Sequence, residues 1–351
     1  MGMVRVLLAV AVLLSHLSMA NYKVLSGGLA VQSFFIISGF YMALVLDEKY
    51  RDVGLFYSNR LLRLFPTYLA MLALGIVAIF IGANPMTSPE LVERIAQNSM
   101  SAVVLGVENF VMVGQDLLFW FTIDANGALI FDPYAELDEN TVIGWQGLAV
   151  PQAWSLSTEL MFYAVAPFLA RLNWRWIVAL AACSIALRLA GHLLDVDYML
   201  WQGRFFPTML FMFLLGMLAY RALPLAARLP KVIGWLALGV LITYCAVYTF
   251  LPMEPLISRW VTYAVVALTI PWIFNAFKDN ALDRWIGDLS YPVYLSQLLV
   301  VGAVLIYEPP FPVLTAFAAT FAISILVLVF IEHPVDRWRQ ARLSRSTRDH
   351  A

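Results

Sequence analysis

Charge and cysteine are both scarce in this chain of 351 residues. Charged residues make up 13% of it, against about 25% in an average soluble domain, so there is too little polar surface to cover a water-exposed globule. The only cysteines, Cys183 and Cys245, lie in apolar runs, which argues against a disulfide framework or a cysteine-built metal site. The sequence also lacks GxGxxG, Walker-type, HExxH and GxSxG motifs and any nucleic-acid-binding signature, and its four scattered histidines predict no metal site.

Hydrophobic residues make up 62% of the chain and fall into runs of a length that crosses a bilayer. The sequence therefore predicts an all-α fold, a polytopic transmembrane helical bundle. We find no soluble domain and no internal repeat. Ten spans are expected, near residues 4–20, 28–46, 66–83, 153–170, 174–193, 205–220, 232–250, 259–277, 289–307 and 312–331.

The positive charges predict the orientation of these spans. Ten spans place 17 of the 22 Lys and Arg residues on the side that holds both termini, which is therefore predicted to be cytoplasmic. This assignment requires 84–152 to stay outside, with 97–114 lying on the membrane or re-entering it. Residues 115–152 contain no Lys or Arg, as suits a translocated loop. The predicted organisation is a membrane domain over 1–337 and a basic cytoplasmic tail over 338–351.

The first apolar run also fits a cleavable signal peptide, with Arg5, an apolar stretch and then Ser18-Met19-Ala20 before Asn21. Cleavage would remove both Arg5 and His16 and would leave the remaining spans with the wrong parity. We therefore favour an uncleaved first span.

His16 is an ionisable residue inside that first span. A charge at a helix centre costs about 2.5–3.5 kcal/mol on insertion scales, so intramembrane ionisable residues are functional candidates. At about 1.5 Å per residue, His16 and Glu159 would both lie roughly 6–9 Å below the outer surface. A carboxylate there could orient the imidazole for acid–base chemistry. The alternatives are a structural pair that lets each group tolerate burial, or a histidine that reaches the interface.

Arg60 and Arg63 share one helix face before the third span. Paired guanidinium groups can bind phosphates bidentately, but the same residues would also satisfy the positive-inside bias and contact lipid headgroups. Glu332 and His333, at the inner end of the last span, are expected to face water or lipid headgroups.

Two further segments are unusual for their setting. Residues 33–42, SFFIISGFYM, place Ser38 and Gly39 in a span, where small residues permit close helix packing.

Residues 284–297, RWIGDLSYPVYLSQ, place Asp288, Ser290 and Tyr291 at the cytoplasmic mouth of a span. Pro292 allows a kink or a helix start there, and Asp288 could be an N-terminal helix cap.

Taken together, these blocks resemble the acyltransferase-3 family of bacterial integral-membrane acyltransferases. The resemblance extends from Arg5 to about Arg337. In the order of the family, the blocks are Arg5 with ten residues to His16; SFFIISGF; Arg60-x-x-Arg63 with Phe65, Pro66 and Tyr68; WSLSTELMFYAVAP at 154–167; and RWIGDLSYPVYLS at 284–296.

The resemblance implies a membrane-bound acyltransferase of the bacterial inner membrane. It would transfer an acyl group, most often acetyl, from acyl-CoA to a hydroxyl of an exopolysaccharide, a lipopolysaccharide or a similar glycan or glycolipid acceptor. No bound cofactor or metal is implied, since acyl-CoA is a co-substrate. The catalytic residues correspond to His16 and Glu159. Donor binding corresponds to Arg5, Arg60, Arg63 and Tyr68, and site lining to Ser38, Trp154, Ser155, Arg204, Asp288, Ser290 and Tyr291.

One position departs from the family. Many relatives carry histidine where this chain has Gln297, and glutamine can form hydrogen bonds but cannot relay a proton. Two rival functions remain: a proton-coupled transporter or flippase of an envelope precursor, with His16 and Glu159 as a relay, and a structural subunit. A transporter would move its substrate without consuming acyl-CoA. The acceptor, the acyl group and the oligomeric state are not encoded in any motif, and His16 could serve as nucleophile or as general base.

Overall fold

The computed structural model describes residues 1–349 apart from 18–23, 51, 135, 139, 195 and 197. The alternative cleavage position at 18–20 lies outside the described residues. The chain forms two compact units. Unit 1 comprises Met1–Tyr57, Phe162–Leu187 and Met209–Tyr294, and unit 2 comprises Ser58–Met161, Arg188–Thr208 and Leu295–Ala351.

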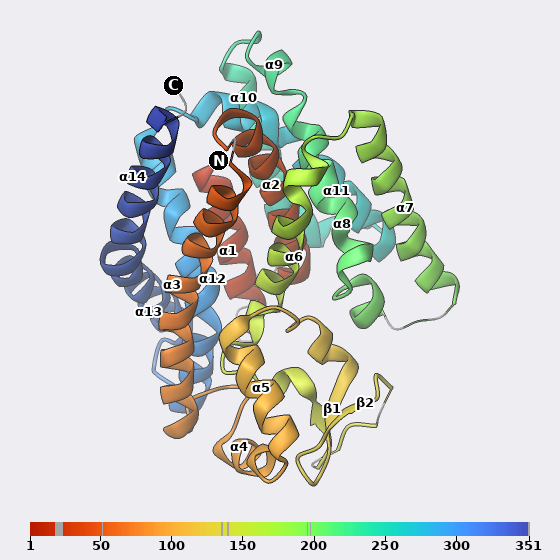
Figure 1. Ribbon diagram of the computed structural model, residues 1–351, viewed down its shortest axis with the longest axis vertical. Coiled ribbons are helices and arrows are strands. Elements are labelled where there is room, and N and C mark those ends of the chain that lie inside the picture. Colours follow the sequence, from red (N-terminus) through yellow and green to blue (C-terminus); the bar gives the residue numbers. More distant parts are fainter. Residues whose placement is uncertain are drawn as a thin grey trace. The chain divides into compact units, whose positions relative to one another are not determined.

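Helices dominate both units (Figure 1). They are α1 (Gly2–His16), α2 (Gly27–Glu48), α3 (Val53–Phe80), α4 (Pro89–Ala96), α5 (Ser99–Val111), α6 (Trp154–Leu169), α7 (Trp174–Leu193), α8 (Phe206–Tyr220), α9 (Leu223–Ala226), α10 (Val232–Val247), α11 (Pro255–Phe277), α12 (Ala281–Tyr307), α13 (Pro312–Val327) and α14 (His333–Asp349). The strands are β1 (Phe121–Ile123), β2 (Leu129–Phe131) and β3 (Val142–Ile143).

The predicted polytopic helical bundle is confirmed. Within the described part of the chain, eight helices are long and apolar enough to cross a membrane. The helices at the remaining two predicted spans, α1 and α6, have 15 and 16 residues, fewer than the roughly 20 that a perpendicular crossing needs. The segment predicted at 97–114 is α5, whose 13 residues extend about 20 Å at 1.5 Å per residue. That length is below what a perpendicular crossing needs, and the predicted non-crossing path of this segment stays a prediction. The predicted sidedness stays a prediction.

Three helices differ at one end from the spans predicted near them. The first helix ends at His16 instead of residue 20, α3 begins at Val53 instead of 66, and α12 begins at Ala281 instead of 289. In α3 and α12, a polar and charged stretch precedes the apolar run, so hydropathy placed the start too late. Helices extend beyond the hydrocarbon layer without any change in their backbone hydrogen bonding.

The start of α12 also corrects the reading of Asp288 and Pro292. Both lie inside the helix, so Pro292 does not start it and Asp288 does not cap it. The cap is Asn280, whose side chain accepts a hydrogen bond of 3.0 Å from the backbone N–H of Asp283.

In unit 1, α2 and α8 pack with their backbones in contact. A β-carbon added to Gly39 would lie 1.9 Å from the carbonyl oxygen of Phe213, and one added to Gly216 would lie 1.9 Å from that of Ile36. The ring of Phe213 stacks on that of Phe35 at 4.8 Å. The predicted packing role of Gly39 is confirmed, because only residues without a side chain allow so close an approach.

In unit 2, residues 84–152 form a separate layer, here termed the loop layer, which gathers α4, α5 and the strands at one end of the unit (Figure 1). The strands form a small antiparallel sheet in the order β2-β1-β3. The sequence predicted only turns here, because strands of two or three residues are too short to show a period. The core of the layer consists of Leu91, Ile95, Leu105, Leu118, Ile123 and Leu148.

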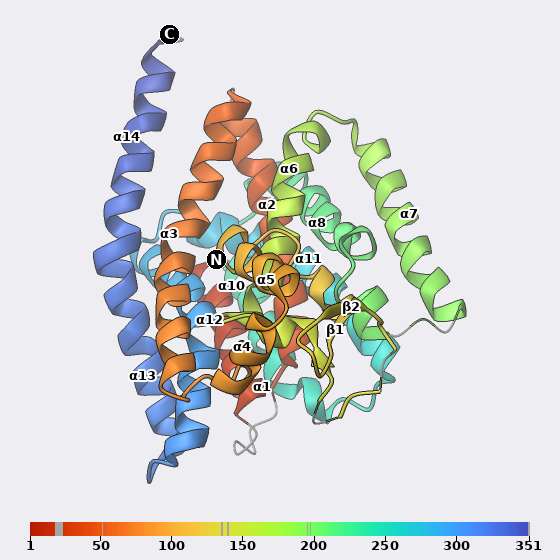
Figure 2. The same ribbon diagram turned by 60° about the horizontal axis from the view of Figure 1, so that its bottom comes forward.

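Unit 2 also contains the last helices. A π-helical turn, Leu328–Glu332, joins α13 to α14, and the three continue as one long rod beside α3 (Figure 2). The guanidinium of Arg342 in α14 donates a hydrogen bond of 2.9 Å to the hydroxyl of Ser58 in α3. The segment predicted as a basic tail is therefore helical up to Asp349 and is joined to α3.

Candidate functional site

In unit 1, the first and fifth sequence blocks meet at the starts of α1 and α12. The backbone N–H groups of Gly2 and Met3 donate to the carboxylate of Asp283 at 2.8 and 2.9 Å. A β-carbon added to Gly287 would lie 2.7 Å from the α-carbon of Gly2 and 3.6 Å from Nη1 of Arg5. Arg5 is therefore held beside the GDLSYP segment by two close-packed helix ends.

The other predicted residues of unit 1 differ in their exposure. His16 is the last residue of α1 and is exposed, so it does not lie one turn inside the helix as the predicted span implied. Ser38 and Tyr291 are buried in α2 and α12. Ser290 is also buried, with its hydroxyl donating 2.6 Å to the carbonyl of Gly287. Asp288 is half-buried.

In unit 2, Arg63 pairs with a buried carboxylate. Its Nη1 lies 3.3 Å from Oε2 of Glu332, and the hydroxyl of Thr67 donates 3.0 Å to Oε1 of the same residue. Only 4% of the Glu332 side chain is exposed. The expectation that Glu332 faces water or headgroups was therefore wrong. The sequence could not indicate this burial, because the partner of Glu332 lies 269 positions earlier in the chain.

We expect Glu332→Leu to lower the stability of the protein by about 3–5 kcal/mol, because it leaves the Arg63 charge without its buried carboxylate. The double variant Arg63→Met/Glu332→Leu should recover most of this loss, since removal of both charges is often neutral. Thermal unfolding of the detergent-solubilised protein measures both. A stable Glu332→Leu protein would contradict the structural role of the pair.

The WSLSTE block contacts the segment around Arg204. The guanidinium carbon of Arg204 lies 3.6 Å from the ring centre of Trp154 and 4.4 Å from that of Phe119. Cation–π contacts at these distances hold a guanidinium in a fixed place. Trp154 and Arg204, both predicted to line the site, are thus brought together, and Phe119 joins them from the loop layer.

Ser157, in the same block, anchors the end of α5. The backbone N–H of Gly114 donates 2.8 Å to the hydroxyl of Ser157, which donates 2.5 Å to Oδ1 of Asp116. Asp116 is completely buried. Gly114 has a φ of +102°, a conformation that favours glycine, and a β-carbon there would lie 2.9 Å from the Glu108 carboxylate. The turn therefore holds the Asp116 carboxylate on Ser157 and the Glu108 carboxylate beside Gly114.

Both carboxyls titrate far from their ordinary range. Burial raises the pKa of Asp116 to about 6, although the hydrogen bond from Ser157 and the charge of Arg204 act in the opposite direction. Burial, with a smaller contribution from the negative charge of Asp116, raises the pKa of Glu108 to about 7. Carboxyls with such pKa values can take up and release protons near neutral pH.

Tyr68 contacts the same layer. Its hydroxyl donates 2.6 Å to the backbone carbonyl of Asn109 and accepts 3.0 Å from the side-chain amide of Gln115. Tyr68 and Gln115 are completely buried. The Tyr68 hydroxyl therefore links α3 to Asn109, next to Glu108, and to Gln115, next to Asp116.

The remaining predicted residues of unit 2 lie in α3 and α6. Arg60 is in α3, and Glu159 is half-buried in α6, six residues into the helix as expected. Ser155 is buried and donates 3.2 Å to the carbonyl of Gln152. Gln297, at the position that departs from the family, is completely buried in α12.

Sequence reasoning missed Glu108, Asp116 and Ser157 as a group. Asp116 was considered only as part of the segment 115–152, whose lack of Lys and Arg suits a translocated loop. The one available signal was Glu108 itself, the only charged residue of the 13-residue, largely apolar segment that forms α5.

The fold and these buried ionisable groups define an integral membrane protein of the polytopic helical class. The chain belongs to the acyltransferase-3 family, whose family model, described as an acyltransferase domain, matches residues 1–332. It is therefore a membrane acyltransferase.

Two curated relatives are similar over most of their length. Nodulation protein 10 of Rhizobium leguminosarum bv. viciae is 24% identical over 344 residues, which cover 90% of this chain and 84% of the relative. Exopolysaccharide production protein ExoZ of Rhizobium meliloti is 25% identical over 333 residues, which cover 90% of this chain and 92% of the relative. No solved structure matches the chain.

Proposed function

We propose that this protein transfers an acyl group, acetyl in the first instance, from acyl-CoA to a hydroxyl of an extracytoplasmic glycan. The family match over residues 1–332 carries the proposal. The glycan acceptor is supported by the similarity to a protein named for exopolysaccharide production. The proposed location is the bacterial inner membrane, between a cytoplasmic donor and an outer acceptor.

In the proposed reaction, the thioester C–S bond of the donor breaks and an ester C–O bond to the acceptor oxygen forms. The acceptor proton ends on the coenzyme A thiolate. His16 serves either as the base that removes this proton or as the nucleophile that first accepts the acyl group. Its position at an exposed helix end supports this role, since the reacting groups must reach the imidazole. Glu159 is proposed to orient the imidazole.

Donor binding is proposed for the basic groups on the predicted cytoplasmic side, Arg5, Arg60 and Arg63, and for Tyr68 through its support of the α3 segment. Arg5 is fixed beside Gly287, and Arg63 is oriented by Glu332. Pre-positioned guanidinium groups lose less freedom when they bind a phosphate. Acceptor contacts are proposed for Trp154 and Arg204, which lie together at the loop layer.

Inside-out membrane vesicles that contain the protein and surface glycan precursors provide the test. When isotope-labelled acetyl-CoA is added to the cytoplasmic face, mass spectrometry should find labelled acetyl ester on the glycan, and vesicles without the protein should give none. Glycan movement without consumption of acetyl-CoA would instead support a flippase and would overturn the proposal.

A further inference from the structure

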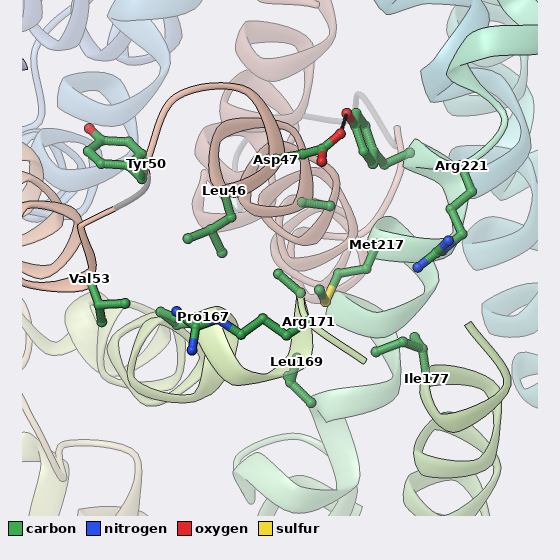
Figure 3. Close-up of a pocket in the computed structure, with 13 residues that line it drawn as sticks. Leu46, Asp47, Tyr50, Val53, Pro167, Leu169, Arg171, Ile177, Met217 and Arg221 are labelled. Atoms are coloured by element: carbon green, nitrogen blue, oxygen red, sulfur yellow. Dashed lines mark hydrogen bonds between the residues drawn. The ribbon is translucent and has the colours of Figure 1, made fainter. Parts of the chain in front are cut away.

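A cavity of about 330 Å³ lies within unit 1, between the end of α2, the end of α6, the start of α7 and the end of α8 (Figure 3). Its lining combines two arginines, one carboxylate and two tyrosines with an apolar floor. The polar members are Asp47, Tyr50, Arg171, Tyr220 and Arg221.

The cavity opens among segments that the charge pattern places in the cytoplasm. Asp47 is in the last turn of α2, and Tyr50 belongs to the connection that follows this helix. Arg171 belongs to the connection that follows α6, and Arg221 to the one that follows α8. These connections carry much of the positive-inside bias on which the topology rests. The cavity is therefore on the side from which an acyl-CoA donor would arrive.

Two charged groups of the cavity, Asp47 and Arg221, form hydrogen bonds with neighbouring residues. The hydroxyl of Tyr220 donates 2.6 Å to Oδ2 of Asp47, which is the dashed contact in Figure 3. Nη2 of Arg221 lies 3.5 Å from the backbone carbonyl of Leu172, in the connection that also carries Arg171. Both arginines are exposed, so a dissolved ligand can reach them.

This set of groups suits the nucleotide end of coenzyme A. Two guanidinium groups on separate connections can bind separate phosphates bidentately. The Asp47 carboxylate can accept a hydrogen bond from a ribose hydroxyl or an adenine amino group. The apolar side chains Leu46, Val53 and Met217 and the ring of Tyr50 offer surfaces for a flat base. The volume is at the lower end of the roughly 300–1,000 Å³ of ligand pockets, which suits a nucleotide without its pantetheine arm.

We propose that this cavity binds the adenosine phosphate portion of the acyl-CoA donor, with Arg171 and Arg221 on the phosphates and Asp47 on the nucleoside. The inference rests on the proposed function for the identity of the donor. It adds a nucleotide site to the arginines of α3, and none of its residues was singled out by the sequence motifs.

The test uses the full-length protein in phosphatidylcholine nanodiscs, with adenosine 3′,5′-bisphosphate as the probe and calorimetry as the measurement. The double variant Arg171→Gln/Arg221→Gln should weaken binding at least tenfold. The matched control is Arg228→Gln, which removes an exposed arginine on the same predicted side but outside the cavity. It should change the Kd less than twofold. A double variant with the Kd of the wild type, or an equal loss in the control, would overturn the proposal.

A lipid headgroup carries the same phosphate chemistry, so nanodiscs with phosphatidylglycerol form the second arm. Retained nucleotide binding supports the proposal, whereas its abolition by the anionic lipid identifies a headgroup site and overturns it. The acetyl-transfer assay separates this inference from the proposed function. If the double variant forms the ester with an unchanged donor KM, the proposed nucleotide site is wrong and the proposed function stands. If nucleotide binding depends on both arginines but the wild-type protein forms no ester, the nucleotide site stands and the proposed function is wrong.

Discussion

Replacement of His16 by alanine is expected to reduce acyl transfer by about 10²–10⁴-fold, the range that a positioned general acid or base contributes. The loss is larger if His16 carries the acyl group, because the covalent route then disappears. Folding should be nearly unaffected, since His16 is exposed at the last position of α1 and exposed side chains contribute little to stability. The measurement is mass spectrometry of acyl esters on surface glycans of a deletion strain complemented with each variant.

Ser15→Ala is the matched control, because Ser15 is exposed beside His16 and its hydroxyl donates a hydrogen bond to the carbonyl of Val12 in the same helix. It should restore the ester to the wild-type level. Equal restoration by His16→Ala would remove His16 from the chemistry. Acyl label retained on His16 after a rapid quench without acceptor would identify the nucleophile, and label found only on the acceptor would favour the general base.

The variant Gly39→Leu is expected to abolish the folded protein. Even a methyl group at this position would lie 1.9 Å from the carbonyl oxygen of Phe213, far inside van der Waals contact, so α2 and α8 would have to separate. Overpacking of a core by single methylene groups already costs about 1–3 kcal/mol, and here the obstacle is backbone, which cannot rotate away. Fluorescence-detected size-exclusion chromatography of detergent extracts should show aggregate in place of a monodisperse peak.

A second glycine in the same helix supplies the control. A β-carbon on Gly28 would meet nothing within 4 Å, so Gly28→Ala should give a normal peak and a slightly higher melting temperature, because alanine is favoured over glycine in a helix by about 1 kcal/mol. A monodisperse Gly39→Leu protein would show that the α2–α8 contact is looser than the structure has it.

The bundle and the role of Gly39 could be predicted because they depend on local composition: apolar runs of bilayer length, and a small residue within one of them. Arg60 and Arg63 could be placed on one helix face for the same reason. The helix ends could not be placed, because the start of α12 depends on a capping bond from Asn280 that hydropathy does not detect.

Side-chain contacts between residues far apart in the sequence could not be predicted either. Nothing near Glu332 in the sequence indicates that Arg63 and Thr67 will surround it. In the same way, Asp116 is an unremarkable loop acid until Ser157 and Arg204 are brought to it. The arginines proposed for donor and acceptor binding were singled out by motif spacing and by the family resemblance. Arg171 and Arg221, in contrast, border a cavity that exists only once four helices have packed.

The orientation of α14 depends on the number of residues in the π-helical turn at Leu328–Glu332 as well as on their identity. Such a turn absorbs one more residue than an α-helical turn does, and each residue of an α-helix advances the direction of side chains by about 100°. Deleting a single residue here would rotate α14 by about that angle and carry Arg342 away from Ser58. Single-codon insertions and deletions should therefore be far more harmful at this turn than conservative substitutions at the same codons.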